Sequence, residues 1–230
     1  MQHKSSPPLP KSSTPRWLVP VILGAVLLVA IAVVFNAMQP SRATQEASNA
    51  PGLGGGIPIP TSGTRIEPPR QLNNFTLTNQ DGQPISLSDF AGKPTLIYFG
   101  YTYCPDVCPT SLADMARAQK LLGDLGTEVN FVMVSVDGER DTSDVLKRYI
   151  GNFSETFVGL TAPPSEIRKI APDYGVFFQK NQVAGTSAAY LVDHSTAIYL
   201  VDPQGRLHTI YGYGIPPTVL EQDLRQMLGG

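Results

Sequence analysis

Apolar residues are distributed along the chain in two contrasting ways. Near the N-terminus a single apolar segment, residues 17–35, runs for nineteen positions without a charged side chain. From about Gln71 onward the apolar residues form short runs separated by glycine, proline and polar residues. The first pattern is typical of a helix that crosses a bilayer, which needs about 20 apolar residues, and the second is typical of a folded domain.

The short runs predict strands that alternate with helices. Residues 74–90 predict a hairpin that turns at Asp81-Gly82, a dipeptide favoured in tight turns. Further strands are predicted at 93–101, 129–137 and 157–161, helices at 110–126, 141–153, 163–175 and 216–228, and a second hairpin at 197–214. The helix at 141–153 has Asp141 or Thr142 as its expected cap. This order predicts an α/β domain with a mixed central sheet flanked by helices.

The residues before the apolar segment predict its orientation. Residues 1–16 contain Lys4, Lys11 and Arg16 and no acidic residue, and basic residues stay on the cytoplasmic side. We therefore predict a cytoplasmic tail at 1–16, one N-terminal transmembrane anchor at 17–35, and export of everything that follows. A cleaved signal peptide is the alternative, but its apolar region spans only about 7–15 residues. Prolines in the tail argue against an organellar presequence, so the predicted location is a bacterial inner membrane, with the C-terminal domain in the periplasm.

The exported part divides in two. Residues 36–70 are rich in glycine, proline, serine and alanine, so we predict a flexible linker at 36–70 and a single domain at 71–230. The exported part carries all 19 acidic residues and 14 of the 17 basic ones, a formal charge of −5. A nucleic acid partner is therefore not expected.

Both cysteines lie in one short stretch, GYTYCPDVCPT, residues 100–110. They follow a predicted strand, at the carboxyl end where open α/β sheets carry their sites. Thr110 or Ser111 is the expected cap of the next helix, so Cys108 is expected just before its first turn, where backbone N–H groups favour a thiolate. Three interpretations remain open: a structural disulfide, a redox dithiol and a soft-metal site.

The metal interpretation depends on spacing and on a third ligand. Three residues between the cysteines give a wider loop than a redox dithiol has, able to hold a metal between the sulfur atoms. Two thiolates favour Cu(I), and an added imidazole also suits Cu(II), whereas structural zinc takes four ligands. His3 lies on the predicted cytoplasmic side, and His208 is expected to be an ordinary strand residue. His194 lies on a predicted turn, where it is either a structural or solvent-facing residue or a ligand that reaches a neighbouring loop.

These residues resemble a known family. The stretches YTYCPDVCPTSL, FVMVSVDGERDT and YLVDHSTAIYLVDPQG begin at Tyr101, Phe131 and Tyr190. They are similar to those of the Sco/SenC family of copper-binding proteins for cytochrome c oxidase assembly. The resemblance runs from about Phe75 to the C-terminus and includes the N-terminal anchor. It implies a thioredoxin-like fold in which Cys104, Cys108 and His194 bind one copper ion. The wider loop still allows the two cysteines to form a disulfide when no metal is bound.

The resemblance also implies a function and partners. The protein is expected to be a membrane-anchored metallochaperone that delivers Cu(I) or Cu(II) to the CuA site of cytochrome c oxidase subunit II. A periplasmic copper donor or thiol reductant is expected to serve it. The alternative is a thiol-disulfide reductase that reduces the cysteines of the same CuA site, so enzyme activity is left open.

Other residues near the motifs have two interpretations each. Asp137 is expected to support the ligands or to take part in docking, or else to cap a helix or loop. Asp106, between the cysteines, is expected to orient a thiol or meet the partner, or else to be solvated. Gly138 stands where family members often have proline, which predicts a looser loop. Four aromatic residues flank the cysteines and are expected to pack in the core or to form a cover that keeps water from the metal: Tyr98, Phe99, Tyr101 and Tyr103.

Overall fold

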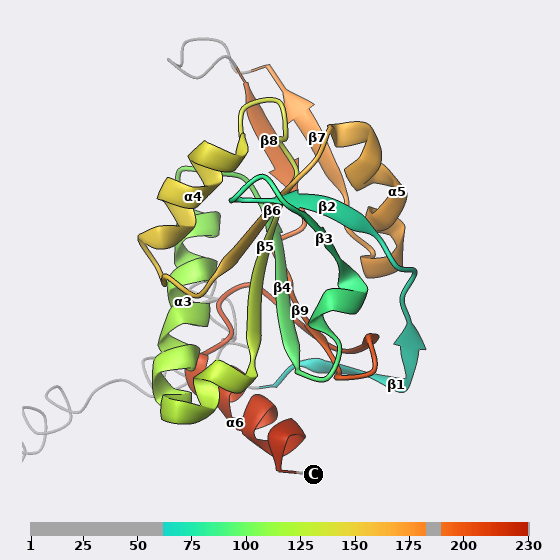
Figure 1. Cartoon of the computed structure of the whole chain (residues 1–230), viewed down its shortest axis with the longest axis vertical. Helices are drawn as coiled ribbons and strands as arrows, with labels where there is room; N and C mark the ends of the chain where they lie inside the picture. Colours follow the sequence, from blue (N-terminus) through green and yellow to red (C-terminus); the bar gives the residue numbers. More distant parts are fainter. Residues whose placement is uncertain (1–61, 183–189, 230) are drawn as a thin grey trace, which may run out of the picture. The chain divides into compact units, whose positions relative to one another are not determined.

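An eight-stranded sheet organises the part of the chain that the computed structural model describes, residues 62–182 and 190–229 (Figure 1). From one edge to the other its strands are β1 (Thr64–Gln71), β10 (Arg206–Tyr211), β9 (Ile198–Val201), β4 (Thr95–Gly100), β5 (Asn130–Ser135), β6 (Val158–Thr161), β2 (Thr76–Asn79) and β3 (Pro84–Ser86). Strands β4, β5 and β6 are parallel, and the other neighbouring pairs are antiparallel. The predicted mixed sheet and thioredoxin-like arrangement are confirmed.

Strand β4 lies at the centre of the sheet. Its six residues are all buried, as expected for a strand with a neighbour on each side and helices on both faces. Successive side chains point to opposite faces, and Phe99 packs against Tyr174 of α5 (Pro164–Tyr174), with ring centroids 5.0 Å apart. On the other face Gly100 lies against Cys108 of α3 (Val107–Leu122). The strand therefore ends between two helices, with the cysteine loop at its carboxyl end.

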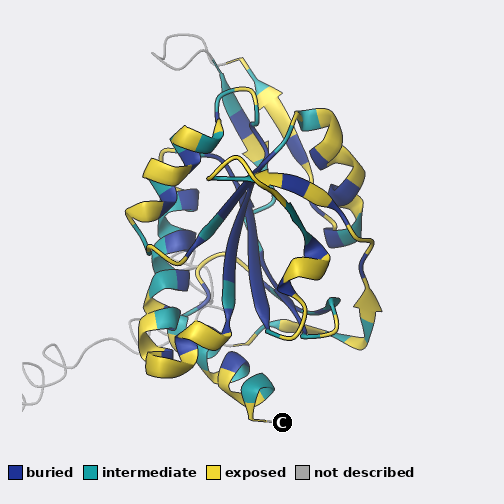
Figure 2. Ribbon diagram, in the orientation of Figure 1, coloured by how far each residue is buried: buried dark blue, intermediate teal, exposed yellow. Residues whose placement is uncertain are grey.

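Two further helices complete the layers around the sheet. Helix α4 (Ser143–Gly151) begins after Thr142, whose hydroxyl accepts a hydrogen bond from the Val145 N–H, so the predicted cap is Thr142 and not Asp141. Helix α6 (Pro217–Leu228) packs along α3. Short 3₁₀ turns, η1 (Leu87–Phe90) and η2 (Gly123–Glu128), follow β3 and α3. Figure 2 shows buried central strands and exposed outer helix faces.

A separate two-stranded sheet is formed by β7 (Phe178–Asn181) and β8 (Leu191–His194). This hairpin lies beyond the ends of the central strands, at the top of the view in Figure 1. Phe178 pairs with His194, so the histidine lies at the base of the hairpin. The hydrophobic pattern does not predict β7, because only one of its four side chains is buried.

The first strand of the domain differs from the prediction. The sequence predicts a linker up to residue 70, but Thr64–Gln71 form β1, which pairs with β10 at the edge of the sheet. The side chains of this strand are largely exposed, so its sequence lacks the alternation of buried and exposed positions that predicts a strand. An edge strand tolerates the two prolines it contains. The predicted tail at 1–16, the anchor at 17–35 and most of the linker lie outside the described residues. Within the described ranges no helix is long and apolar enough to cross a membrane.

Candidate metal centre

The loop between β4 and α3 carries Cys104 and leads directly into Cys108. Helix α3 begins at Val107, with Asp106 preceding it, so the predicted start at Thr110 or Ser111 is wrong and Cys108 lies within the first turn. Proline at the third helical position does not interrupt this turn, because the N–H it lacks would have no partner there. Cys104 is half-buried, whereas Cys108 is completely buried.

Gly100, the last residue of β4, makes room for the Cys108 sulfur. A Cβ atom at this position would lie 2.6 Å from Tyr98 Cε1 and 3.0 Å from Cys108 Sγ. Both neighbours are completely buried in a close-packed interior, so neither can move aside easily. The glycine therefore lets the sulfur approach the sheet and fixes its depth below the surface.

His194 approaches the cysteines from the separate hairpin. Its Nε2 lies 3.2 Å from Cys108 Sγ, and its Nδ1 lies 2.8 Å from the backbone oxygen of Ser195. A carbonyl oxygen only accepts hydrogen bonds, so Nδ1 carries the hydrogen, and in the neutral ring Nε2 keeps its lone pair. Metal-binding histidines are commonly oriented by such a bond from the other ring nitrogen. This tautomer directs a ligand atom at the sulfur atoms.

Three ligand atoms therefore meet at one place. The sulfur atoms of Cys104 and Cys108 and a ring nitrogen of His194 all lie within 4.8 Å of one another. Two soft sulfurs and one imidazole form a donor set that fits the predicted copper in either oxidation state. Beside them is an open cavity of about 340 Å³, lined by residues that include Tyr101, Cys104, Pro105, Val107, Leu191 and His194. The half-buried ligands Cys104 and His194 are accessible from this cavity.

The two thiols differ in acidity. A hydrogen bond from Cys108 lowers the pKa of Cys104 to about 3, and His194 and the backbone N–H groups of Asp106 and Cys108 act in the same direction. The same contact between the cysteines, together with burial, raises the pKa of Cys108. The two thiols are coupled, and the directions of the two shifts favour the thiolate on Cys104. Cys104 is also the less buried of the two, so it is the nucleophile of the pair.

Aromatic rings pack against the imidazole. Tyr98 and Tyr101 contact His194 edge to face, with ring centroids 6.1 and 5.6 Å from that of the imidazole. Tyr98, Phe99 and Tyr101 are buried, which confirms the predicted core packing for these three. Tyr103 is instead 53% exposed, because it lies on the loop and not on the strand.

The other predicted site residues lie in different surroundings. Asp106 is exposed, and its backbone oxygen accepts hydrogen bonds from the N–H and hydroxyl of Thr110. Asp137 is completely buried and bonds to Arg140 and Tyr190, so its carboxylate is not on a docking surface. His208 lies on β10, with Nδ1 2.8 Å from the hydroxyl oxygen of Thr209, and is not part of the three-ligand group.

Asp141 has a role that the sequence does not reveal. Its carboxylate accepts hydrogen bonds from the N–H of Thr102 (2.9 Å), from the hydroxyl of Thr102 (2.6 Å) and from the hydroxyl of Ser135 (2.6 Å). Burial raises the pKa of Asp141, and these hydrogen bonds oppose that effect. The side chain ties the cysteine loop to the end of β5. The only signal in the sequence is its place shortly after a predicted strand, which fits a helix cap equally well.

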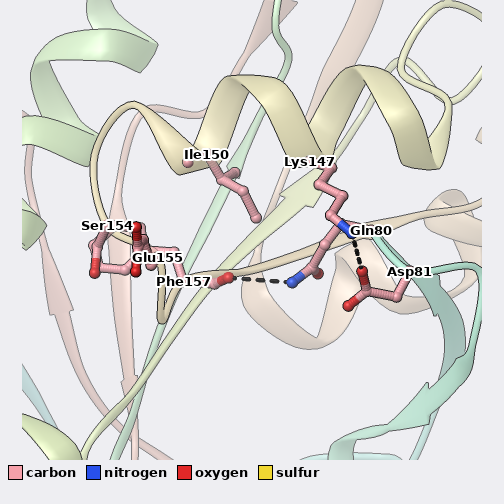
Figure 3. Close-up of a pocket in the computed structure, with 8 residues that line it drawn as sticks. Gln80, Asp81, Lys147, Ile150, Ser154, Glu155 and Phe157 are labelled. Atoms are coloured by element: carbon pink, nitrogen blue, oxygen red, sulfur yellow. Dashed lines mark hydrogen bonds and ion pairs between the residues drawn. The ribbon is translucent and has the colours of Figure 1, made fainter.

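A second cavity, of about 280 Å³, lies between α4 and the turn after β2 (Figure 3). Lys147 forms an ion pair with Asp81 beside it, with Nζ 2.8 Å from Oδ1. The Gln80 amide donates a hydrogen bond to the backbone oxygen of Phe157. None of the predicted site residues lines this cavity, so it is not part of the metal centre.

Curated relatives match part of the chain. The Arabidopsis thaliana protein SCO1 homolog 1, mitochondrial, is 38% identical over 139 residues, which cover 60% of this chain and 41% of that protein. Protein SenC of Rhodobacter capsulatus is 40% identical over 130 residues, 56% of this chain and 58% of SenC. The chain thus matches about half the length of these two relatives.

Solved structures share the fold. Copper-bound ScoI of Bradyrhizobium japonicum has a TM-score of 0.63 and 37% identity, covering 68% of this chain and 99% of that one. Copper-bound yeast Sco1 has a TM-score of 0.64 and 28% identity, covering 70% and 90%. A family model described as SCO1/SenC matches residues 64–229, a range that contains all three ligand residues. The chain therefore belongs to the SCO1/SenC family.

Proposed function

We propose that this protein is a copper metallochaperone that binds one copper ion through Cys104, Cys108 and His194 and delivers it to the CuA site of cytochrome c oxidase subunit II. The observation that carries the proposal is the meeting of two sulfur atoms and one ring nitrogen within 4.8 Å. Copper in two related solved structures supports the choice of metal. One structural relative is described as a member of the Sco family of cytochrome c oxidase assembly proteins, which supports the choice of partner.

The three ligands differ in accessibility, so an acceptor is expected to replace them in a defined order. Cys104 and His194 are half-buried beside the open cavity, whereas Cys108 is completely buried. An acceptor's ligands therefore replace Cys104 and His194 first, and Cys108 releases the ion last. Copper binds both sulfur atoms as thiolates, so binding releases any proton that the coupled pair still holds.

The proposed location follows from the sequence. Residues 17–35 anchor the protein in a bacterial inner membrane, with the tail in the cytoplasm and the domain in the periplasm. A periplasmic copper donor loads the site, or a periplasmic reductant restores the thiols from a Cys104–Cys108 disulfide. Anchoring donor and acceptor in one membrane raises their effective concentration.

A thiol-disulfide reductase is the second candidate, and the lowered pKa of Cys104 favours it. In this reaction the Cys104 thiolate attacks the disulfide of an oxidised CuA site and forms a mixed disulfide, releasing one acceptor thiolate. Cys108 then loses its proton and displaces the second acceptor sulfur. The acceptor ends as two thiols, and this protein ends with a Cys104–Cys108 disulfide. His194 forms no bond to the acceptor in this exchange, but its Nε2 lies 3.2 Å from Cys108 Sγ and can take the proton that Cys108 loses.

Complementation separates the two candidates. Deleting the gene is expected to lower cytochrome c oxidase activity, most strongly when copper is scarce. The unmodified gene and His208→Ala, a matched histidine control, should restore activity, whereas Cys104→Ala and His194→Ala should not. Restoration by His194→Ala but not by Cys104→Ala would favour the reductase. Unchanged oxidase activity in the deletion strain at every copper level would contradict both candidates.

A further inference from the structure

The ligands of the metal centre belong to two separate sheets of the described structure. The cysteines lie on or directly after the β4–α3 loop, at the end of the eight-stranded sheet, whereas His194 ends β8 in the two-stranded sheet. The position of the imidazole relative to the sulfur atoms therefore depends on contacts between these sheets and the loops around them.

One loop contacts both ligand-bearing segments. Residues 137–141 follow β5 and are called the clamp loop below. At its C-terminal end Asp141 accepts two hydrogen bonds from Thr102, two residues before Cys104. At its N-terminal end Asp137 accepts a hydrogen bond from the hydroxyl of Tyr190, which directly precedes β8. The clamp loop therefore fixes the cysteine loop and the histidine strand relative to each other.

The contacts with Tyr190 form a closed network of three residues. The Tyr190 hydroxyl lies 2.7 Å from Asp137 Oδ1, and Arg140 Nη1 donates to the Tyr190 backbone oxygen at 3.1 Å. The Arg140 guanidinium also lies over the Tyr190 ring, 3.7 Å from its centroid, and pairs through Nε with Asp137 Oδ2. Both the ring and the backbone before β8 are thus held. Asp137, Arg140 and Tyr190 are called the Tyr190 network below.

The ion pair of the Tyr190 network is largely sheltered from water, and Tyr190 itself is partly buried. The side chain of Asp137 has no exposed surface, and that of Arg140 is 18% exposed. Gly138 packs so closely against the backbone oxygen of Ala162 that a Cβ atom would collide with it, so the glycine does not make this a loose loop. Glu139 pairs with Lys180 of β7 and adds a second link to the hairpin. Removing one partner from a buried ion pair leaves the other charge unpaired, which is costly in free energy, so a single substitution here should displace the residues that the network holds.

We propose that Asp137, Arg140 and Tyr190 are positioning residues that hold His194 at the sulfur atoms and thereby strengthen the binding of Cu(II) more than that of Cu(I). Thiolates alone suit Cu(I), whereas the imidazole makes the donor set suitable for Cu(II). Tyr190 leads into the strand that ends in His194, so the network acts through the histidine. This inference rests on the proposed copper site.

The test compares Tyr190→Phe and Asp137→Asn with the unmodified protein. Tyr190→Phe keeps the ring beside Arg140 and removes only the hydrogen bond to Asp137. This variant therefore tests the proposal even if Asp137→Asn fails to fold. The reduced full chain, in detergent and without oxygen, is titrated separately with Cu(II) and Cu(I) against a competing chelator. Each variant is expected to bind Cu(II) roughly tenfold to a hundredfold more weakly, and Cu(I) within about twofold of the unmodified protein.

A double variant separates positioning from general support of the fold. In a His194→Ala background, Tyr190→Phe is expected to leave the Cu(II) affinity unchanged, because the histidine through which it acts is gone. Asp202→Asn is the matched control. Asp202 is another buried carboxylate paired with an arginine, Arg206, and it follows the end of β9 that is farther along the chain from His194. Removing its charge should leave both copper affinities unchanged.

Three outcomes would overturn the proposal: equal losses of Cu(I) and Cu(II) affinity, the same Cu(II) loss with and without His194, or no loss in Tyr190→Phe. Absence of copper binding by the unmodified protein is a different result. It would overturn the proposed copper site itself, and the positioning role with it.

Discussion

The cysteine loop and the histidine hairpin contribute to one metal centre but are built very differently. The cysteine loop extends from β4, which has a neighbour on each side and six buried residues. The hairpin has two strands of four residues, and only Phe178 and Val192 among them are buried. Two-stranded hairpins are marginally stable on their own, so this one depends on its contacts with neighbouring loops.

This difference assigns separate roles to the ligands. The main sheet and α3 fix the sulfur of Cys108, so its position is maintained as long as the domain is folded. The position of His194 depends on a smaller set of contacts, which can open while the core stays intact. In the proposed transfer of copper to an acceptor, we therefore expect the histidine to be the ligand most easily withdrawn.

Hydrogen exchange should show the largest contrast. We expect amides of β4 to exchange only by global unfolding and those of β7 and β8 to exchange by local opening, with protection factors lower by roughly a hundredfold or more. The measurement is amide exchange on the reduced, copper-free protein, followed residue by residue. Equal protection in β4 and the hairpin would contradict the claim that the hairpin opens while the core stays folded.

A substitution at Gly100 tests how firmly the core holds Cys108. Gly100→Ala places a methyl group against Tyr98 and Cys108, so the free energy of unfolding should fall by about 1–3 kcal/mol. Chemical denaturation measures this change. Gly151→Ala is the control, since no atom lies within 4 Å of the added Cβ in α4, and a gain of about 0.5–1 kcal/mol is expected. Unchanged stability in Gly100→Ala would contradict the tight packing of the sulfur.

The pH dependence of alkylation tests the difference in acidity between the two thiols. The expected change in the alkylation rate of Cys104 is small. A thiol with a lowered pKa keeps its reactive thiolate above that pKa and loses it only as the pH falls through it. With a pKa of about 3, Cys104 should react with iodoacetamide at nearly the same rate from pH 8 to pH 5. An ordinary thiol, with a pKa of about 8.5, would slow by nearly a thousandfold over the same range.

Mass spectrometry of the reduced, copper-free protein gives this rate for each cysteine. Cys104→Ser is the control, because the remaining Cys108 is completely buried and should react very slowly. A steep fall in the Cys104 rate below pH 8 would contradict the proposed ionisation.

Much of the fold is predictable from the sequence because the central strands are continuous apolar runs. The runs at 93–101 and 129–137 became β4 and β5, and the Asp81-Gly82 turn joins β2 to β3. Strands β1 and β7 were not predictable from periodicity, because edge and hairpin strands with exposed side chains lack a buried face. The predicted cap at Thr110 or Ser111 is wrong because α3 begins at Val107, and Pro109 is compatible with the first turn of a helix.

The candidate site is predictable only in part. Spacing alone indicated that Cys104 and Cys108 act together, but the contribution of His194 came from a resemblance, since 86 residues separate it from Cys108. No local pattern indicates that Tyr190 meets Asp137, because the contact joins the residue before β8 to the loop that follows β5. Such contacts follow from the tertiary structure and not from periodicity.

The most direct test of the central claim is the stoichiometry and absorption spectrum of Cu(II) bound to the reduced protein, measured beside Cys104→Ala, His194→Ala and His208→Ala. The account predicts one Cu(II) per chain with an intense sulfur-to-copper absorption in the unmodified protein and in His208→Ala. That absorption should be lost in Cys104→Ala and His194→Ala. Cu(II) bound by His194→Ala with unchanged affinity and spectrum would contradict the three-ligand centre.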